Sequence, residues 1–172
     1  MTCLALLLLS LVAAPETLSE RIDSLARTAL DPTSLYTHGD TVSLYGVRTN
    51  GADTKQGRWA CAKVTSIVLR RAGAMRSVVL GVRDVENALK GWKRIDDEDS
   101  LRPGDVVVWT RRYDAPKDGS CIGGGTCHVG VQTSRGRFHN DPLLRRPSFD
   151  GIALAAFRFK SGYRPPRRTN SR

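Results

Sequence analysis

The sequence predicts an α+β domain with its helices first and its antiparallel strands after them. Patterns of helical period cover residues 17–30, 59–72 and 82–89. Short runs of β-branched and aromatic residues follow, separated by Pro-Gly and Ser-Arg-Gly turn signals. This segregation of helices and strands along the chain is typical of α+β folds. The chain has 172 residues, the length of one domain that can bury its own core.

The helices are predicted from their caps as well as from their periods. Thr17 and Glu20 have the spacing of a capping box, and Asp31-Pro32 ends the apolar pattern that follows them. The second helix ends at Gly73. Between these helices, residues 33–57 are rich in Gly, Thr, Ser and Asn and show no sustained period. We expect a long connection with short turns there, of a kind that is often functional.

The strands are predicted from alternation and from the turns between them. Pro103-Gly104 leads into a strand over residues 106–110, and "CHVGVQT" forms a second strand. "SRG" is a hairpin turn, and its partner strand is "RFHN". A last strand is expected over residues 153–160. The basic, proline-containing segment 164–172 is expected to be a disordered tail.

The composition limits the class of partner. The net charge is +10 at pH 7, which favours an anionic partner such as nucleic acid, a membrane surface or the bacterial cell wall. Aromatic residues make up only 6% of the chain, and no nucleic-acid motif with interleaved aromatic residues is present. We therefore expect no nucleic-acid partner. Peptidoglycan or another anionic wall polymer as the partner, and a monomer, are expected together with the resemblance described below.

Residues 1–14 are expected to be a secretory signal. Leu4–Ala14 is an apolar run too short to span a bilayer, and it ends in small residues suited to cleavage. A buried first helix is the alternative, but an apolar helix without a polar face would need cover on all sides. We therefore expect an exported protein, periplasmic or secreted, with no transmembrane segment and a single domain over residues 15–163.

The four cysteines are expected to have different roles. Cys3 lies in the expected signal, whereas Cys121 and Cys127 flank the flexible "IGGGT" and predict a disulfide in an exported protein. Cys61 is then unpaired, and a small buried apolar residue is the simplest interpretation of it. A zinc site built from Cys61, Cys121, Cys127 and His128 lacks the paired C-x₂-C spacing, so no metal is expected.

Cys61 also has the features of a nucleophile. It lies in the first turn of its predicted helix, where unpaired N–H groups and the helix dipole lower a thiol pKa. His128 begins a strand, which is a rigid place for a base. On the next strand, either Asn140 or His139 is placed to orient the far ring nitrogen of His128. His38 lies in "YTHGD" and is interpreted as a loop residue, and His139 taken alone as a surface residue.

The order of the Cys-led helix, "LRPGDVVVW", "CHVGV" and "GRFHND" resembles that of the NlpC-type and CHAP cell-wall cysteine peptidases, over roughly residues 59–159. The resemblance implies a papain-like fold in which Cys61 is the nucleophile and His128 the general base. In these peptidases the third catalytic residue lies two positions after an apolar residue on the same strand face. Phe138 is that apolar residue, which implies Asn140, with His139 as the alternative.

The resemblance also implies the remaining parts of the mechanism. The Cys61 backbone N–H is one expected oxyanion donor, and Gln56 is a second by analogy with papain. No cofactor is implied. The expected activity is hydrolysis of an amide bond in peptidoglycan, as an endopeptidase or an amidase. Two alternatives stay open: a non-catalytic basic wall-binding domain on the same scaffold, and a secreted thiol amidase or acyltransferase that acts on another substrate.

Overall fold

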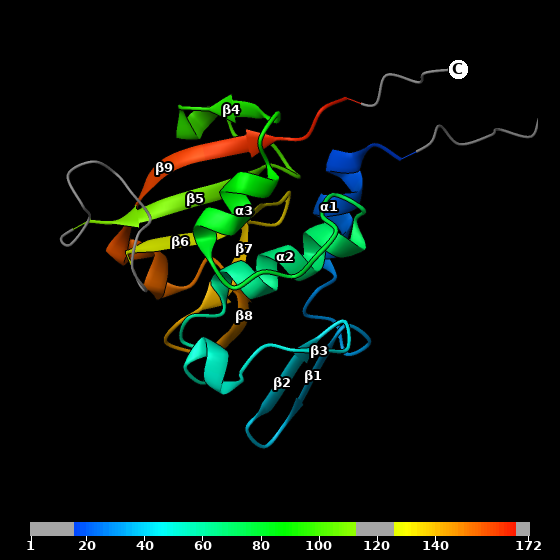
Figure 1. Ribbon diagram of the computed structural model, residues 1–172, viewed down its shortest axis with the longest axis vertical. Coiled ribbons are helices and arrows are strands. Elements are labelled where there is room, and N and C mark those ends of the chain that lie inside the picture. Colours follow the sequence, from blue (N-terminus) through cyan, green and yellow to red (C-terminus); the bar gives the residue numbers. More distant parts are fainter. Residues whose placement is uncertain (1–15, 113–125, 168–172) are drawn as a thin grey trace, which may run out of the picture.

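The computed structural model describes residues 16–112 and 126–167, and these residues form an α+β fold with three α-helices and two antiparallel sheets. A six-stranded sheet carries the helices on one face, and a separate three-stranded sheet extends from the first helix (Figure 1). The helices are α1 (Leu18–Arg27), α2 (Cys61–Arg71) and α3 (Val82–Ala88). The α+β class is therefore as the sequence predicts.

The large sheet has the order β4-β9-β5-β6-β7-β8, and every neighbouring pair is antiparallel. Its strands are β4 (Lys93–Ile95), β5 (Val106–Arg111), β6 (Cys127–Gln132), β7 (Arg137–Asp141), β8 (Arg146–Phe149) and β9 (Phe157–Arg164). The small sheet holds β1 (Leu35–His38), β2 (Thr41–Leu44) and β3 (Val47–Arg48). Short 3₁₀ helices occupy Ala52–Thr54, Glu98–Ser100 and Ile152–Ala156.

The two faces of the large sheet bury different clusters. On the helix face, α1, α2 and α3 pack on alternate strand residues, among them Val108, Val129 and Phe138. On the other face, Val107, Trp109 and Phe157 form a smaller cluster. Side chains alternate between the two faces along a strand. Each side chain of β5, β6 and β7 therefore lies either on the helix face or on the opposite face of the sheet. This division decides which side chains can meet at the site described below.

The start of α1 confirms the predicted capping box. The Thr17 hydroxyl accepts from the Glu20 backbone N–H at 3.2 Å, and the Glu20 carboxylate accepts from the Thr17 N–H at 2.6 Å. The predicted helices at α2 and α3, the strands β5, β6 and β7, and the hairpin turn between β6 and β7 are also present. Local patterns of caps and alternation were sufficient to locate these elements.

Two sequence-based expectations about the chain's organisation are wrong. Residues 33–57 are not a connection with short turns, because β1, β2 and β3 form a meander there whose turns contain Gly39 and Gly46 at positive φ. Residues 153–160 are not one strand: a 3₁₀ helix ends at Ala156, and β9 then continues to Arg164. Arg164 is thus part of the sheet rather than of a disordered tail.

Several expectations fall on the termini and on residues 113–125. The expected signal at 1–14, Cys121 and residues 168–172 all lie outside the described residues. Cys127 is disulfide-bonded and Cys61 is a free thiol, so the pairing of Cys127 with Cys121 stays a prediction. None of the helices in 16–112 and 126–167 is long and apolar enough to cross a membrane.

Candidate active site

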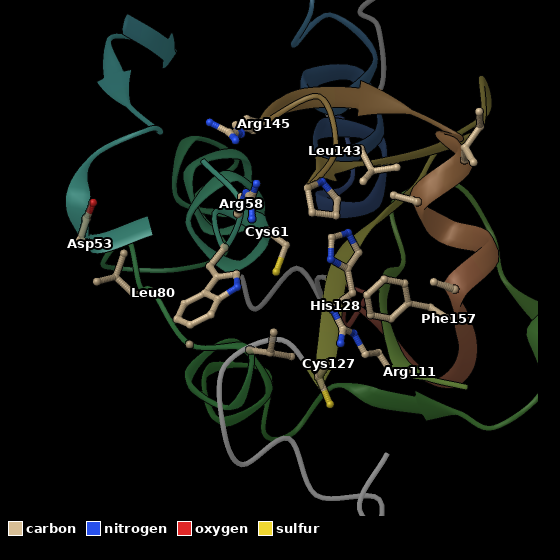
Figure 2. A pocket seen from close by; sticks show the side chains of 17 residues that line it. Asp53, Arg58, Cys61, Leu80, Arg111, Cys127, His128, Leu143, Arg145 and Phe157 are labelled. Atoms are coloured by element: carbon tan, nitrogen blue, oxygen red, sulfur yellow. The ribbon is translucent and has the colours of Figure 1, made fainter. Parts of the chain in front are cut away.

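A pocket of about 770 Å³ opens where α2 and β6 begin. The turn between β7 and β8 and the 3₁₀ helix before β9 close its other side. Both Cys61 and His128 line this pocket, and Figure 2 shows their side chains within it. Residues 67 positions apart in the sequence are therefore brought to one cavity by the packing of α2 on the sheet.

Cys61 is the first residue of α2 and is buried. The helix has no side-chain cap, because its N-cap is Ala60. Burial raises the pKa of the Cys61 thiol, and this outweighs the backbone N–H groups of Val129, Ala62 and Cys61, which stabilise the thiolate. The expectation of a lowered thiol pKa from the helix start alone is therefore wrong, since it left out desolvation.

His128 lies on the sheet face opposite α2, with only 4% of its surface exposed. Its ring packs between Trp109 and Phe157, at centroid distances of 5.9 Å and 5.0 Å. Burial lowers the pKa of His128 well below its usual value, and the nearby His139 lowers it further. His128 is therefore a neutral imidazole at pH 7 and retains a lone pair with which to accept a proton.

His139, and not Asn140, contacts the far nitrogen of His128. The two rings share a hydrogen bond of 2.9 Å between His128 Nε2 and His139 Nδ1. Because Nε2 of His128 is occupied by this hydrogen bond, Nδ1 is the ring nitrogen that remains to accept the thiol proton of Cys61. No hydrogen bond joins Cys61 to His128 within the described residues, an arrangement common in enzymes without bound substrate.

The tautomer of this histidine pair decides whether His128 can act as a base. If His128 Nε2–H donates to His139 Nδ1, the lone pair of His128 is on Nδ1, where the thiol proton would arrive. His139 then carries its proton on Nε2, which is buried and has no partner among the described residues. Burial also lowers the pKa of His139, so the pair is neutral at pH 7.

The implied role of Asn140 is corrected for a reason of strand register. In the ladder, Val131 pairs with Phe138 and Gly130 pairs with His139. His128 alternates with Val129 and Val131, so it shares a face with Gly130 and His139 rather than with Phe138. His139 is fully buried, and its interpretation as a surface residue is also wrong.

Asn140 instead fixes the segment that leads into α2. Its side-chain N–H donates to the Gly57 carbonyl at 2.7 Å, across the helix-side core. Gly57 has a φ of +85°, and a Cβ there would lie 2.5 Å from the Arg145 carbonyl oxygen, so only glycine fits. Asn140 and Gly57 together hold the loop that ends at Cys61, which makes Asn140 a supporting residue.

Gly130 makes room for the histidine pair. A Cβ at this position would lie 3.0 Å from the His139 Cβ and 2.3 Å from the Phe138 carbonyl oxygen. Such contacts are too close, so a side chain at Gly130 would push β7 away from β6. The glycine of "HVG" thus has a steric function beside the two rings.

The structure bears on the two expected oxyanion donors. Gln56 is exposed and does not line the pocket, so it is not placed as an oxyanion donor. The first-turn N–H groups of α2 remain available for that role, since α2 has no side-chain cap. In the described part of the chain, no group of three or more His, Cys, Asp or Glu side chains could hold a metal ion.

Sequence reasoning missed the arginines of the pocket and most of its apolar lining. Arg58, Trp59 and Arg145 line it beside Cys61. Figure 2 shows the guanidinium groups of Arg58 and Arg145 on one side of the cavity, and Arg111 on the other side near His128. Asp53, the carboxylate of this lining, is bound to Lys63 at 2.7 Å. Arg58 lies three residues before Cys61 in the sequence, whereas Arg145 comes from the β7–β8 turn and had no local signal.

Alkylation of Cys61 by iodoacetamide is expected to be slow at pH 7 and to accelerate with pH. A raised thiol pKa leaves little thiolate, and below that pKa the thiolate fraction grows about tenfold per pH unit. The measurement is intact-mass detection of the adduct after timed exposure across the pH range. A rate plateau extending below pH 7 would instead indicate a thiolate–imidazolium pair and contradict the neutral resting state.

No protein-family model, curated protein or solved structure matches this chain. The case for its chemistry therefore rests on the geometry of Cys61, His128 and His139.

Proposed function

We propose that this protein is an exported cysteine hydrolase that cleaves an amide bond in peptidoglycan. The observation that carries the proposal is the buried His128–His139 hydrogen bond of 2.9 Å beside a free thiol in the same pocket. A nucleophile, a base and a group that orients the base are the three parts that such catalysis needs. Export rests on the apolar N-terminal run and the net charge.

The neutral resting state sets the order of the proton transfers. Nδ1 of His128 takes the thiol proton as the Cys61 sulfur attacks the amide carbon, and the carbonyl oxygen becomes an oxyanion. The uncapped N–H groups at the start of α2 stabilise that charge. The imidazolium then gives its proton to the leaving amine, and the C–N bond breaks to leave a thioester on Cys61.

Water completes the reaction. His128, neutral again, takes a proton from water as the oxygen attacks the thioester, and the thiol leaves with that proton. His139 accepts the Nε2–H of His128 throughout and stabilises the imidazolium, whose formation in this buried place is otherwise costly. His139 is therefore a positioning residue rather than one that touches the substrate.

The pocket's charge favours an anionic substrate. Arg58 and Arg145 line the cavity, and the carboxylate of Asp53 is already bound to Lys63. Peptide stems of the bacterial wall carry carboxylates, and a planar guanidinium binds a carboxylate through two parallel hydrogen bonds. The overall charge of +10 further supports adsorption to an anionic wall.

Digestion of purified peptidoglycan by the native protein and by Cys61→Ala, followed by mass spectrometry of the soluble products, tests the proposal. We expect new fragments from the native protein and none from Cys61→Ala, because the thiol is the nucleophile. The fragment masses identify the bond and distinguish an amidase from an endopeptidase. Fragments from both proteins would remove Cys61 from the mechanism, and fragments from neither would exclude peptidoglycan as the substrate.

A further inference from the structure

The exposed large apolar side chains of this protein gather around one opening. Within the described residues they are six, and four of them line the pocket: Trp59, Leu80, Leu143 and Ile152. We call these four the apolar rim. They come from four separate places in the chain, namely the segments before α2 and α3, the β7–β8 turn and the 3₁₀ helix before β9. Their gathering around one opening distinguishes them from exposed apolar residues scattered singly over a surface, which are ordinary.

Two members of the rim expose most of their surface. Ile152 is 86% exposed and Leu143 is 70% exposed, although both contribute to the pocket lining. A small substrate inside the pocket would leave most of that surface in water. Figure 2 shows Leu80 and Leu143 on opposite sides of the pocket, with Cys61 and His128 between them. Side chains that surround an opening in this way suit contact with a broad apolar surface.

The rim is held in place by the fold. The buried carboxylate of Asp141 accepts the backbone N–H groups of Leu143 and Leu144, at 2.7 Å and 3.1 Å, and so fixes the turn that exposes Leu143. On the other side, the Lys55 ammonium lies 3.5 Å from the centre of the Trp59 ring. Leu143 is thus exposed by a defined turn. The contact with Lys55 holds the ring of Trp59, a residue type that is enriched at membrane interfaces.

The charge around the rim favours an anionic surface. Arg58 and Arg145 line the same pocket, Arg146 follows in the chain and is exposed, and the net charge is +10. Each basic residue near an anionic membrane surface adds attraction, and apolar residues add to it by entering the boundary between headgroups and acyl chains. An acidic protein would match the arginines but not a ring of separately projecting apolar side chains.

We propose that the apolar rim docks the pocket on an anionic lipid bilayer. The rim side chains enter the headgroup region, while the exposed Arg146 and the net positive charge attract the anionic headgroups. The pocket then faces the membrane surface. This inference goes beyond the proposed hydrolase activity and does not depend on it, because docking requires no reaction.

Sedimentation with lipid vesicles tests the proposal. The probes are vesicles of equal parts phosphatidylcholine and phosphatidylglycerol, and vesicles of phosphatidylcholine alone. We expect the full chain to bind the mixed vesicles and to bind the uncharged ones at least about tenfold more weakly. Leu143→Glu and Ile152→Glu should each lower binding to the mixed vesicles by about tenfold, because each replaces an inserted apolar group with a repelled charge.

Tyr36→Glu is the matched control. Tyr36 is an exposed large apolar residue on β1, away from the pocket, and its substitution changes the net charge by the same amount. Equal weakening by Tyr36→Glu and Leu143→Glu would mean that net charge alone drives binding and would overturn the proposal. Absence of binding to mixed vesicles would overturn it as well. Cys61→Ala should bind like the native chain, which separates this test from that of the hydrolase activity.

Discussion

Replacement of His139 by Ala is expected to lower kcat by about 10²- to 10⁴-fold, the range found when a catalytic base loses its function or its correct tautomer. The reason is the hydrogen bond of 2.9 Å that His139 Nδ1 makes with His128 Nε2. Without an acceptor there, His128 can place its proton on Nδ1, where it blocks abstraction of the thiol proton. KM should change little, since His139 does not line the pocket.

The neighbouring Asn140→Ala provides the matched control for this prediction. Asn140 donates to Gly57 in the helix-side core, so its loss should lower the free energy of unfolding by about 1–3 kcal/mol. Any loss of kcat should be much smaller than in His139→Ala. His139→Gln should restore part of kcat, because its side-chain carbonyl can accept from Nε2. Steady-state kinetics at matched folded fractions check all three variants. A larger loss of kcat in Asn140→Ala than in His139→Ala would mean that Asn140, and not His139, orients His128.

Replacement of Arg164 by Ala is expected to lower the free energy of unfolding by about 3–5 kcal/mol, the usual cost of breaking a buried ion pair. Arg164, the last residue of β9, bonds both carboxylate oxygens of Asp105, at 3.0 Å and 2.7 Å. The Asp105 side chain is 1% exposed, so removal of the guanidinium leaves a buried charge with only the Arg102 backbone N–H beside it.

Chemical denaturation of the native protein, Arg164→Ala and Arg167→Ala checks this prediction. Arg167 is exposed and lies beyond β9, so its replacement should change stability by less than about 0.5 kcal/mol. A loss below about 1 kcal/mol in Arg164→Ala would mean that the pair behaves as an exposed one.

The sequence was most informative where the determinants of structure are local. The capping box at Thr17, the helix of Cys61 and the hairpin after Gln132 each depend on residues within a few positions of one another. The small sheet was missed because residues 33–57 contain strands of two to four residues. Strands that short carry too few alternations to be distinguished from turns.

The third member of the site illustrates a limit of reasoning within single strands. The spacing of two positions after Phe138 predicts Asn140, but the strand face that meets His128 is set by the pairing of Gly130 with His139. His128 alternates with Val129 and Val131, and this alternation is readable from the sequence. Applied across the hairpin, it would have placed His139 beside His128. The register of the β6–β7 hairpin, rather than the spacing within β7, therefore identifies His139 as the partner of His128.

The raised thiol pKa and the arginines of the pocket were not accessible from the sequence. Burial of Cys61 depends on how α2 packs against β6 and β7, which is a property of the whole core. Arg145 reaches the pocket because Gly57 allows the β7–β8 turn to approach the start of α2 closely. Contacts between distant segments of this kind have no local sequence pattern.

Detection of an acyl intermediate on Cys61 is the most direct test of the central claim. The native protein would be mixed with peptidoglycan, quenched in acid within the first turnovers, and mapped by peptide mass spectrometry. The account predicts a thioester on the peptide that contains Cys61, with a mass increase equal to the acyl half of the cleaved bond, and its absence in Cys61→Ala. Soluble products without any adduct on Cys61, and equally abundant from Cys61→Ala, would contradict it.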